Sequence, residues 1–355
     1  AHVRRSESVG ARAEDVPMPE PQSPGIENME TPVKYNYGTF RVTRPTIKAS
    51  QNEAGAWVSA LKLVMDDIKE SETFDVARQM VFGDGTGRLA QVAGGVASAA
   101  TQTITVDNPG VDYLRVNMVI DIYNGATLER DSGTITAVNK PANQITVTFA
   151  AAAAVSDNAF IYREDAKDSE MMGLGGIVDD GSRLANFQGL SRATNDWLKA
   201  NVLANGGALR PLTLDLIDRG YLEAESSANG GYPTAIYSRH IHALKYAQLM
   251  KTDRHWDPKQ MTLDGGWRAV EYTGPGGTCP WIMDRTVRRN EVLMVHEPDL
   301  ALWVLSPMQF VDDDGHILHR SHERKDAFDG YLASYEQLGA HRCDRHTVIK
   351  DLAEA

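Results

Sequence analysis

Cysteine is scarce in this 355-residue sequence, which contains only Cys279 and Cys343. Two cysteines give no disulfide framework and fit a reducing cytoplasm, although they could pair with each other if the fold brought them together. Long hydrophobic runs are also missing: the nearest, FAAAAAV at residues 149–155, is far shorter than the roughly eighteen residues of a membrane span. The first residues, AHVRRSESVG, lack the hydrophobic core of a signal peptide. We therefore expect a soluble protein that neither enters a membrane nor is secreted by that route.

Positive charge is in deficit as well, because 36 Lys and Arg residues face 48 Asp and Glu residues, for a net charge of -12. This balance argues against a surface that grips nucleic acid by its phosphates. Any nucleic acid nearby would be enclosed or passed, without sequence-specific binding. Hydrophobic residues make up 42% and charged residues 24% of the chain, which is long enough for one large domain or two to three modest ones.

No nucleotide-binding signature is present, although residues 82–90 read FGDGTGRLA, with Gly83, Gly85 and Gly87 close together. A Walker loop needs G-x-x-x-x-G-K-[ST], and a dinucleotide fingerprint needs G-x-G-x-x-G between a strand and a following helix. This loop matches neither, and it follows a helical stretch instead of opening one. We interpret Gly83 as a left-handed C-cap and Asp84–Gly85 as a tight turn, and we expect no cofactor.

Catalytic and metal-binding patterns are weak. HRCDRH brings His341, Cys343 and His346 together, as in a metal half-site or a thiol beside an imidazole, but no second Cys or His pair has zinc-site spacing. A solvated strand is the favoured interpretation. Two further groups are interpreted as a solvated loop and a turn: His316, His319 and His322, and Asp312, Asp313 and Asp314. With no G-x-S-x-G and no H-E-x-x-H, we expect no catalytic, cofactor-binding or metal-binding residues, and no enzyme.

The first third of the chain contains three distinct patterns. Residues 1–33 hold several prolines among Glu, Ser and Arg and show no periodicity, so this arm should be ordered only by contacts with a neighbouring chain. Residues 35–48 favour two extended segments broken at Arg44–Pro45. Ser50 and Glu53 have capping-box spacing, and a helix is predicted from there to about Phe82, with a stripe of apolar residues that resumes at Phe74, Ala77 and Val81.

The rest of the chain mixes strands and helices. Between Thr103 and Arg163, five short alternating segments separated by turn residues predict a small closed β-barrel inserted into a host domain. Helical stripes follow at 211–224 and 239–250, and the segments TAIYS, WRAVEYTG, EVLMVHE and LALWVLS predict strands. The predicted class is α+β with a barrel insert.

The order of these parts resembles the major capsid proteins of tailed bacteriophages with the HK97-type fold. The stretches that carry the resemblance are FGDGTG after the long helix, MMGLGGIVDDG, FQGLSRATNDWLKANV, LTLDLIDRGYLEAES and the terminal YLASYEQLGAHRCDRHTVIKDL. The resemblance implies an N-terminal arm (1–33), an extended β-loop (34–50), a peripheral domain with its spine helix (51–99), an inserted β-barrel (100–165), a mainly axial domain (166–324) and return strands of the peripheral domain (325–355).

The resemblance also implies a function. Such a protein assembles with copies of itself into hexamers and pentamers of an icosahedral shell around double-stranded DNA, in the cytoplasm of a bacterial host, and becomes part of the virion. Portal, scaffolding and decoration proteins are implied as further partners. Some relatives cross-link their subunits through a loop lysine; Lys34 and Lys48 flank that loop here, but no reacting Asn is identifiable.

Two alternatives stay open at this level. One is a cellular shell of the same fold, an encapsulin-type nanocompartment loaded with an enzyme. The other is a cytoplasmic hydrolase that uses Cys343 with His341 or His346. For a shell, we expect Ile26, Met29 and Val33 to anchor the arm on a neighbour, where Arg4 and Arg5 would meet an acidic surface.

Overall fold

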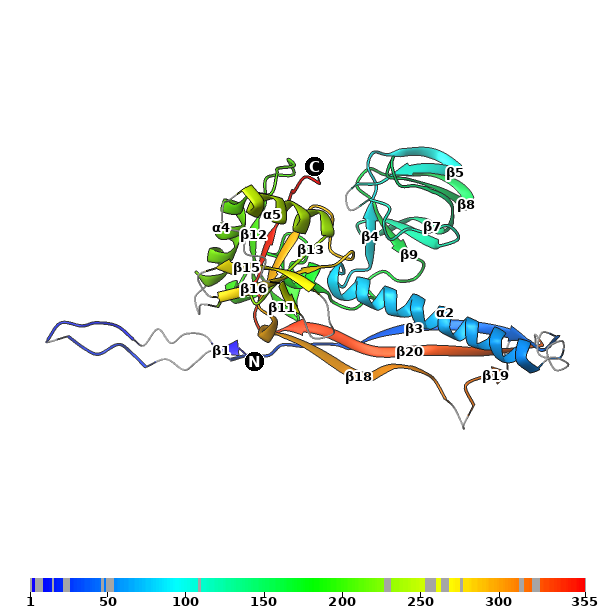
Figure 1. The fold of residues 1–355 in the computed structure, drawn as a ribbon, viewed down its shortest axis with the longest axis horizontal. Helices are drawn as coiled ribbons and strands as arrows, with labels where there is room; N and C mark the ends of the chain where they lie inside the picture. Colours follow the sequence, from blue (N-terminus) through cyan, green and yellow to red (C-terminus); the bar gives the residue numbers. More distant parts are fainter. Residues whose placement is uncertain are drawn as a thin grey trace.

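The computed structural model describes residues 2–3, 9–14, 16–21, 26–45, 48, 54–107, 110–226, 231–252, 260–262, 268–274, 277–312, 316–320 and 326–354. They form an elongated base that carries two lobes on one side, and a thin N-terminal projection extends beyond one end of the base (Figure 1). Among the described helices, none combines the length and the hydrophobicity needed to cross a membrane.

The base is an antiparallel sheet with one long helix, α2 (Ala54–Val81), lying along it. Its strands are β3 (Lys34–Thr43), β18 (Leu300–Phe310), β19 (His319–Arg320) and β20 (Ala327–Ala340). Strand β20 is central, because β3 pairs along one of its edges and β18 and β19 pair along the other. The 28 residues of α2 rise about 1.5 Å each, so the helix is a rod of about 42 Å.

Strand β3 is the first of the two extended segments predicted for residues 35–48, and it ends at Thr43, directly before the predicted break at Arg44–Pro45. Alternate side chains of β3 are buried, including Asn36, Phe40 and Val42, while Tyr35 and Tyr37 are exposed. Because one face of the strand is buried against α2 and the other is open, the segment is built into the sheet. The predicted capping-box pair, Ser50 and Glu53, lies outside the described residues.

The lobe over the middle of α2 is a six-stranded antiparallel barrel. Its strands, in sheet order, are β4 (Arg88–Gln91), β9 (Phe160–Arg163), β6 (Val119–Asn124), β7 (Thr127–Asn139), β8 (Gln144–Val155) and β5 (Val96–Thr105). A bridge between Val92 and Val106 joins the two ends of this order. The interior is mostly apolar, with Ile104, Ile120 and Ile135 fully buried.

The barrel sheet starts earlier in the chain than predicted. Its first strand begins at Arg88, whereas the insertion was placed at 100–165 and residues 51–99 were given to the peripheral domain. The sequence missed β4 because it is short and directly follows the glycine-rich turn. Since Arg88 pairs with Tyr162, the chain enters and leaves the barrel at adjacent points.

The second lobe is built on a seven-stranded mixed sheet. In sheet order its strands are β12 (Asn201–Leu203), β21 (Thr347–Ile349), β17 (Val292–Val295), β13 (Ala235–Ser238), β16 (Gly277–Met283), β15 (Arg268–Gly274) and β14 (Gln260–Thr262). The helices predicted at 211–224 and 239–250 are confirmed as α4 (Leu214–Glu225) and α5 (His240–Thr252). Thr213 caps α4, because its hydroxyl accepts a hydrogen bond from the backbone N–H of Leu216.

Short elements complete the chain. They are β1 (His2–Val3), β2 (Ile26–Glu27), α3 (Leu174–Ile177), β10 (Asn186–Phe187), β11 (Leu190–Ser191) and the 3-10 turns η1 (Asp196–Leu198) and η2 (Glu297–Asp299). Strand β1 pairs with β2, and β10 pairs with β11, in both cases antiparallel.

The C-terminal third does not divide as the resemblance implied. Strands β18 and β19, predicted within the axial segment 166–324, pair with β20 in the base. Strand β21, predicted with the return strands 325–355, lies inside the seven-stranded sheet between β12 and β17. The chain therefore passes from the second lobe to the base and back, and β20 and β21 tie the two together.

Candidate assembly interface

The N-terminal projection is the most exposed part of the described chain. Strands β1 and β2 close it into a hairpin that extends away from the lobes and the base (Figure 1). Its apolar side chains are open to solvent: Val9 is 85% exposed, Val16 50% and Met18 88%. A hairpin that buries so little apolar surface within its own chain is suited to contact another molecule.

The projection is fastened to its own chain at its base. The backbone N–H of Glu30 donates to the carbonyl of Gln188, at 2.9 Å, and the Gln188 amide donates to the Thr31 hydroxyl, also at 2.9 Å. Met29 packs against the buried core of the second lobe. Met29, predicted to anchor the arm on a neighbour, therefore contacts its own chain. The side chain of Ile26 and residues Arg4 and Arg5 lie outside the part of the chain whose contacts are described.

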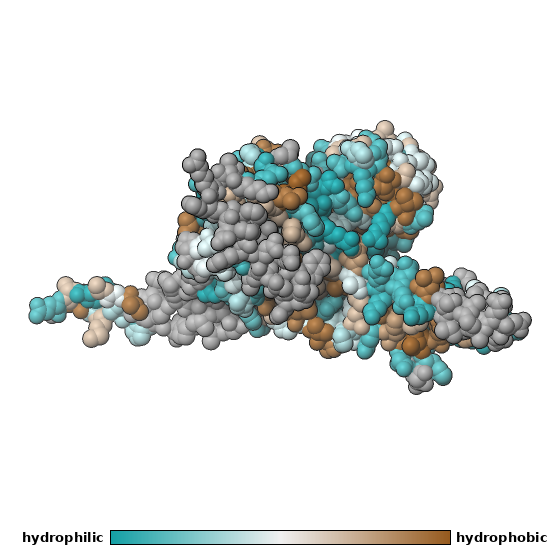
Figure 2. Space-filling view, in the orientation of Figure 1, coloured by the Kyte–Doolittle hydropathy of each residue, from teal (hydrophilic) through white to brown (hydrophobic). Residues whose placement is uncertain are grey.

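Strand β18 forms an open, apolar edge of the base. Within the described sheet it pairs with β20 on one side only. Four consecutive residues of β18 are each more than a third exposed: Leu302, Trp303, Val304 and Leu305. In the same orientation as Figure 1, Figure 2 shows hydrophobic residues along the edge of the molecule where β18 runs. Register shifts beyond Val304 interrupt the other half of the strand. An apolar edge strand with free backbone groups is a ready contact for another chain.

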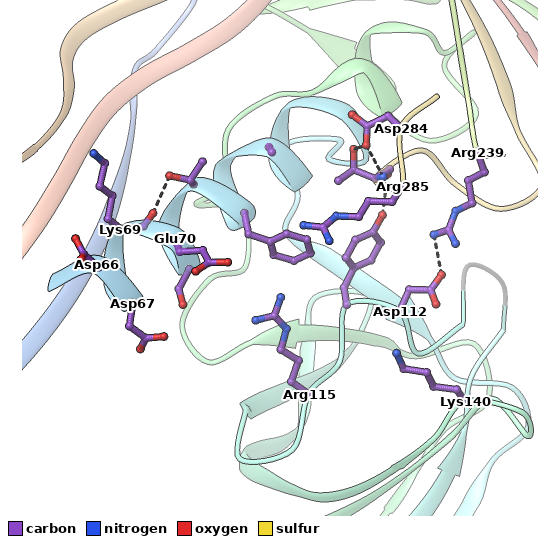
Figure 3. A pocket seen from close by; sticks show the side chains of 16 residues that line it. Asp66, Asp67, Lys69, Glu70, Asp112, Arg115, Lys140, Arg239, Asp284 and Arg285 are labelled. Carbon is purple, nitrogen blue, oxygen red and sulfur yellow. Dashed lines mark hydrogen bonds and ion pairs between the residues drawn. The ribbon is translucent and has the colours of Figure 1, made fainter. Parts of the chain in front are cut away.

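The barrel is fixed to the rest of the molecule by its own side chains. Asp112 binds Arg289 through two hydrogen bonds, of 2.8 and 2.5 Å. It also forms an ion pair with Arg239 at 2.7 Å, which Figure 3 shows. Although burial opposes ionisation, these two arginines lower the pKa of Asp112. The neighbouring Tyr113 donates to the carbonyl of Thr286 at 2.7 Å. The barrel therefore holds an orientation that its two connecting segments alone would not fix.

A groove of about 990 Å³ separates the barrel from α2 at this junction. Phe74 of α2 projects into it between the guanidinium groups of Arg115 and Arg285, each 4.6 Å from the ring centroid. Acidic side chains of α2, including Asp67, face this basic side of the groove (Figure 3). Phe74, predicted in the apolar stripe of this helix, is half-buried, packs against the hydrophobic core of the barrel and also serves as a platform for two cations.

The glycine-rich loop after α2 has a packing role. Gly85 and Gly87 adopt φ values of +80° and +81°, as a tight turn requires, and Asp84 accepts a hydrogen bond from the backbone N–H of Thr86 at 3.0 Å. Gly83 is not left-handed, so its prediction as that kind of cap is wrong. A Cβ on Gly83 would lie 2.3 Å from the carbonyl oxygen of Gln79. Only glycine therefore lets the backbone at residue 83 pack this closely against the last turn of α2.

The residues of HRCDRH form a turn after β20, so the predicted solvated strand is wrong. Cys343 and His346 are fully buried. Burial raises the pKa of the Cys343 thiol to about 12 and lowers the pKa of His346 to about 3. His346 Nδ1 accepts a hydrogen bond from the backbone N–H of His296 at 3.0 Å. Nucleophilic catalysis needs a thiolate within reach of substrate, so this arrangement contradicts a hydrolase that uses Cys343.

The other sequence candidates are dispersed. Cys279 is a free, buried thiol in a different hydrophobic cluster from Cys343. His316 is exposed and His319 lies on β19, whereas His322 and Asp313–Asp314 lie outside the described residues. Lys34 donates to the carbonyl of Asp168 at 2.7 Å. Within the described part of the chain, no group of three or more His, Cys, Asp or Glu side chains is arranged to hold a metal ion.

Sequence periodicity missed a polar cluster on the buried face of α2. The buried residues in its last three turns include Glu72, Val76, Arg78 and Gln79. Spacing of three, four and seven residues places Glu72, Val76 and Gln79 on one face of a helix, so the signal was present in the sequence. It was overlooked because only apolar residues were counted.

Ion pairs and amide bonds hold this cluster together. Arg78 contacts Glu170 at 2.5 Å and Asp75 at 3.1 Å. Gln79 donates to Asn36 on β3 at 3.0 Å and accepts from the backbone N–H of Met171 at 2.9 Å. Burial raises the pKa of Glu170, and Arg78 opposes that shift. The cluster links α2 both to the sheet of the base and to the segment that leaves the barrel.

Comparison with known proteins agrees with this architecture. No protein-family model and no curated protein matches the sequence. A chain of the cyanophage A-1(L) capsid asymmetric unit aligns with 97% of this chain and 85% of its own length, at 15% identity and a TM-score of 0.57. A chain of the satellite phage P4 procapsid that includes the size determination (Sid) protein aligns with 99% and 83%, at 8% identity and a TM-score of 0.38.

A third structure, the holo-SrpI encapsulin complex from Synechococcus elongatus PCC 7942, aligns with 49% of this chain and 60% of its own, at 14% identity and a TM-score of 0.29. Of these, the cyanophage chain has a similarity high enough to define a fold. The resemblance found in the sequence is therefore confirmed at the level of architecture: this chain has the fold of a phage capsid subunit.

Proposed function

We propose that this chain is a major capsid protein that assembles into hexamers and pentamers of an icosahedral shell around double-stranded DNA. The observation that carries the proposal is the shared fold, over 97% of the chain, with the chain of the cyanophage capsid asymmetric unit. The proposed location is the virion, after assembly in the cytoplasm of a bacterial host.

We assign the parts of the fold to those of an HK97-type subunit. The base of α2, β3, β18 and β20 corresponds to the peripheral domain, and the seven-stranded lobe corresponds to the axial domain, which meets its symmetry mates at the centre of a capsomer. The barrel is an added domain, and the hairpin is the arm. These assignments follow the order of elements along the chain.

Contact surfaces support an assembly role. The hairpin exposes Val9 and Met18, and β18 exposes Leu302 to Leu305, so each has apolar surface without cover in the described chain. A ring of identical subunits can cover such surfaces by heterologous contacts, in which one surface of each copy meets a different surface of the next. Portal, scaffolding and decoration proteins are proposed as additional partners.

Net charge supports enclosure of DNA without binding to it. At -12, the chain repels a polyanion on average, so packaged DNA would move along the inner wall without adhering. We therefore expect no sequence-specific contact with DNA.

The test is the assembly state of the full-length protein. We expect sedimentation velocity and negative-stain microscopy of the expressed chain to show capsomers or closed shells. A stable, folded monomer over a wide concentration range would refute the proposal. The contents of native particles separate the two kinds of shell, since a virion contains DNA and an encapsulin-type compartment contains protein cargo.

A further inference from the structure

A cavity of about 560 Å³ lies where β3, α2 and the segment leaving the barrel meet. The charged residues of its lining are mainly acidic, with five carboxylates and two cations: Glu72, Asp75, Glu164, Asp165 and Glu170, with Lys34 and Arg163. None of the sequence motifs uses this cavity, and it is separate from the groove beside the barrel, which is lined by different residues.

Glu72 is the lining residue on which the chemistry of this cavity depends. Its side chain comes from the buried face of α2, and the residue is only 8% exposed. Among the described residues, no donor forms a hydrogen bond or an ion pair with its carboxylate. The oxygens of Glu72 are not among the fully buried polar atoms that lack a partner, so they open to the cavity that Glu72 lines. There they have room for a cationic or donor partner that the described chain does not supply.

The cations near Glu72 are already engaged elsewhere. Arg163 forms an ion pair with Asp75 at 3.5 Å and is nearly half exposed. Lys34 donates to the carbonyl of Asp168. Behind the cavity, Arg78 is shared between Asp75 and Glu170, and the second carboxylate oxygen of Glu170 is buried with no hydrogen-bond partner.

The remaining electrostatic surroundings of Glu72 are unfavourable to its charge. The pKa of Glu72 is raised to about 7, mainly by burial, with smaller contributions from the charges of Asp75 and of Glu336 on β20. Arg163 is the one neighbour that lowers it. The site therefore has a deficit of positive charge near neutral pH, and a cation in the cavity would relieve it.

We propose that this cavity binds an organic cation, an ammonium or guanidinium group whose N–H donors reach Glu72. A multidentate metal site is a poorer match, because no three described carboxylates converge on one point. An N–H cation needs only one or two acceptors and tolerates their separation. Two sources share this chemistry: a free polyamine, or a lysine or arginine side chain of a second copy of the chain.

The first experiment is a calorimetric titration of the unassembled full-length chain with argininamide and, separately, spermidine at pH 8. We expect saturable binding to the wild type. Glu72→Gln should weaken it at least about tenfold, as expected for loss of one charge-assisted hydrogen bond. The matched control is Glu70→Gln, which removes an equal charge from an exposed position on the same helix and should bind as the wild type does. Absence of saturable binding to the wild type, or equal affinity of the Glu70 and Glu72 variants, would overturn the proposal.

A second readout needs no variant. Because the cation pairs with ionised Glu72, affinity for the wild type should rise as pH increases from 6 to 8 and level off above that. Affinity that is flat over this range would also overturn the proposal, and this measurement stays informative if Glu72→Gln does not fold.

Assembled particles distinguish the two sources. If a side chain of a second copy fills the cavity, particles will not bind argininamide, and Glu72→Gln will weaken assembly. If the natural ligand is a free polyamine, particles will bind spermidine as the unassembled chain does. The titration of the unassembled chain does not depend on shell formation, so it can succeed or fail independently of the proposed function.

Discussion

At the scale of single residues, glycines determine how closely segments pack at the end of α2. Gly173 faces the last turn of the helix, where a Cβ would lie 2.0 Å from the carbonyl oxygen of Gln79. Gly175 likewise faces the carbonyl oxygen of Phe82, at 2.5 Å from a Cβ. In this region a side chain of any size would separate backbones that are in direct contact, so the sequence MMGLGG is explained by packing.

Gly87→Val should destabilise the subunit more than the same change at Gly94. Both glycines have φ near +80°, but a Cβ at Gly87 would lie 2.6 Å from the carbonyl oxygen of Ala166, whereas nothing lies within 4 Å of one at Gly94. We expect a loss of about 1–2 kcal/mol at Gly94 from backbone strain alone, and about 1–3 kcal/mol more at Gly87. Chemical denaturation of both variants measures the difference, and equal losses would contradict the packing argument.

Glu72 should make stability depend on pH. Its pKa is raised to about 7 in the folded chain from an ordinary value near 4.5, so the folded state binds more protons than the unfolded state between these values. The free energy of unfolding therefore falls as pH rises through this window. Glu72→Gln removes that penalty and should stabilise the unassembled protein by roughly 1–3 kcal/mol at pH 8, but by little at pH 4.5.

The measurement is the denaturation midpoint of the wild type and Glu72→Gln across this pH range, without added polyamine. Glu70→Gln is the control, because Glu70 is exposed on the same helix. A Glu72→Gln effect that is the same at pH 4.5 and pH 8 would contradict the assigned titration.

At the scale of elements, the helices and most strands were predictable because their patterns are local. The alternating segments of β6, β7 and β8 and the stripes of α4 and α5 are visible in any window of ten residues. Pairing was not predictable, since β20 finds β3 nearly three hundred positions away. The buried face of α2 was misjudged for a different reason: Glu72 and Gln79 are buried by polar partners on other segments, and hydropathy alone does not reveal such partners.

The barrel should be removable as a unit, with boundaries taken from the sheet. Replacing residues 88–163 with a short Gly/Ser linker should leave a folded host, because Arg88 and Tyr162 are paired neighbours. The host should be less stable than the full chain, because Phe82 would lose its contact with Tyr113; the centroids of the two rings lie 4.5 Å apart. Circular dichroism and thermal unfolding test this, and complete insolubility with no native-like signal would count against an autonomous barrel.

A second variant separates the contribution of the ion pairs of Asp112 from that of the rest of the barrel. Asp112→Asn keeps the barrel but removes the charge that holds Arg239 and Arg289. We expect a loss of about 1–3 kcal/mol in the full chain, because both arginines then lose the carboxylate that they share, and Arg289 keeps only the more distant Glu354, at 3.9 Å. If the host without residues 88–163 and the Asp112→Asn variant lose similar amounts of unfolding free energy, the ion pairs of Asp112 account for most of the stabilisation of the host by the barrel.

At the scale of the whole molecule, the surfaces proposed to mediate assembly are spread over an elongated shape and do not converge on one site. The hairpin lies at one end, β18 runs along the base, and the two lobes stand on the other side (Figure 1). The sequence predicted an arm from its prolines, but it could not indicate that the arm is a hairpin or that Met29 belongs to its own chain's core. Both depend on contacts between residues far apart in sequence.

The projecting hairpin should be needed for particles and not for the subunit. Deleting residues 1–27 removes Val9, Val16 and Met18 but retains Met29 and the hydrogen bonds of Glu30 and Thr31 to Gln188. The free energy of unfolding of the unassembled deletion variant should therefore lie within about 0.5 kcal/mol of that of the full-length chain, as expected for the loss of exposed residues. Deleting 1–33 would also remove Met29 and should cost subunit stability.

Particles, unlike the unassembled subunit, should be clearly weakened by the 1–27 deletion. Ordering the arm costs roughly 1–2 kcal/mol per residue in backbone entropy, so it can be ordered only where contacts with a neighbour exceed that cost. Particles of the 1–27 deletion should then dissociate at a lower denaturant concentration than full-length particles, or fail to form. The matched variant combines Val9→Ser, Val16→Ser and Met18→Ser in an intact arm, because it removes the apolar contacts and keeps the chain length. Particles of equal stability in all three proteins would show that the arm is a passive tail, and the proposed contacts of the shell would then have to be made by β18 and the lobes alone.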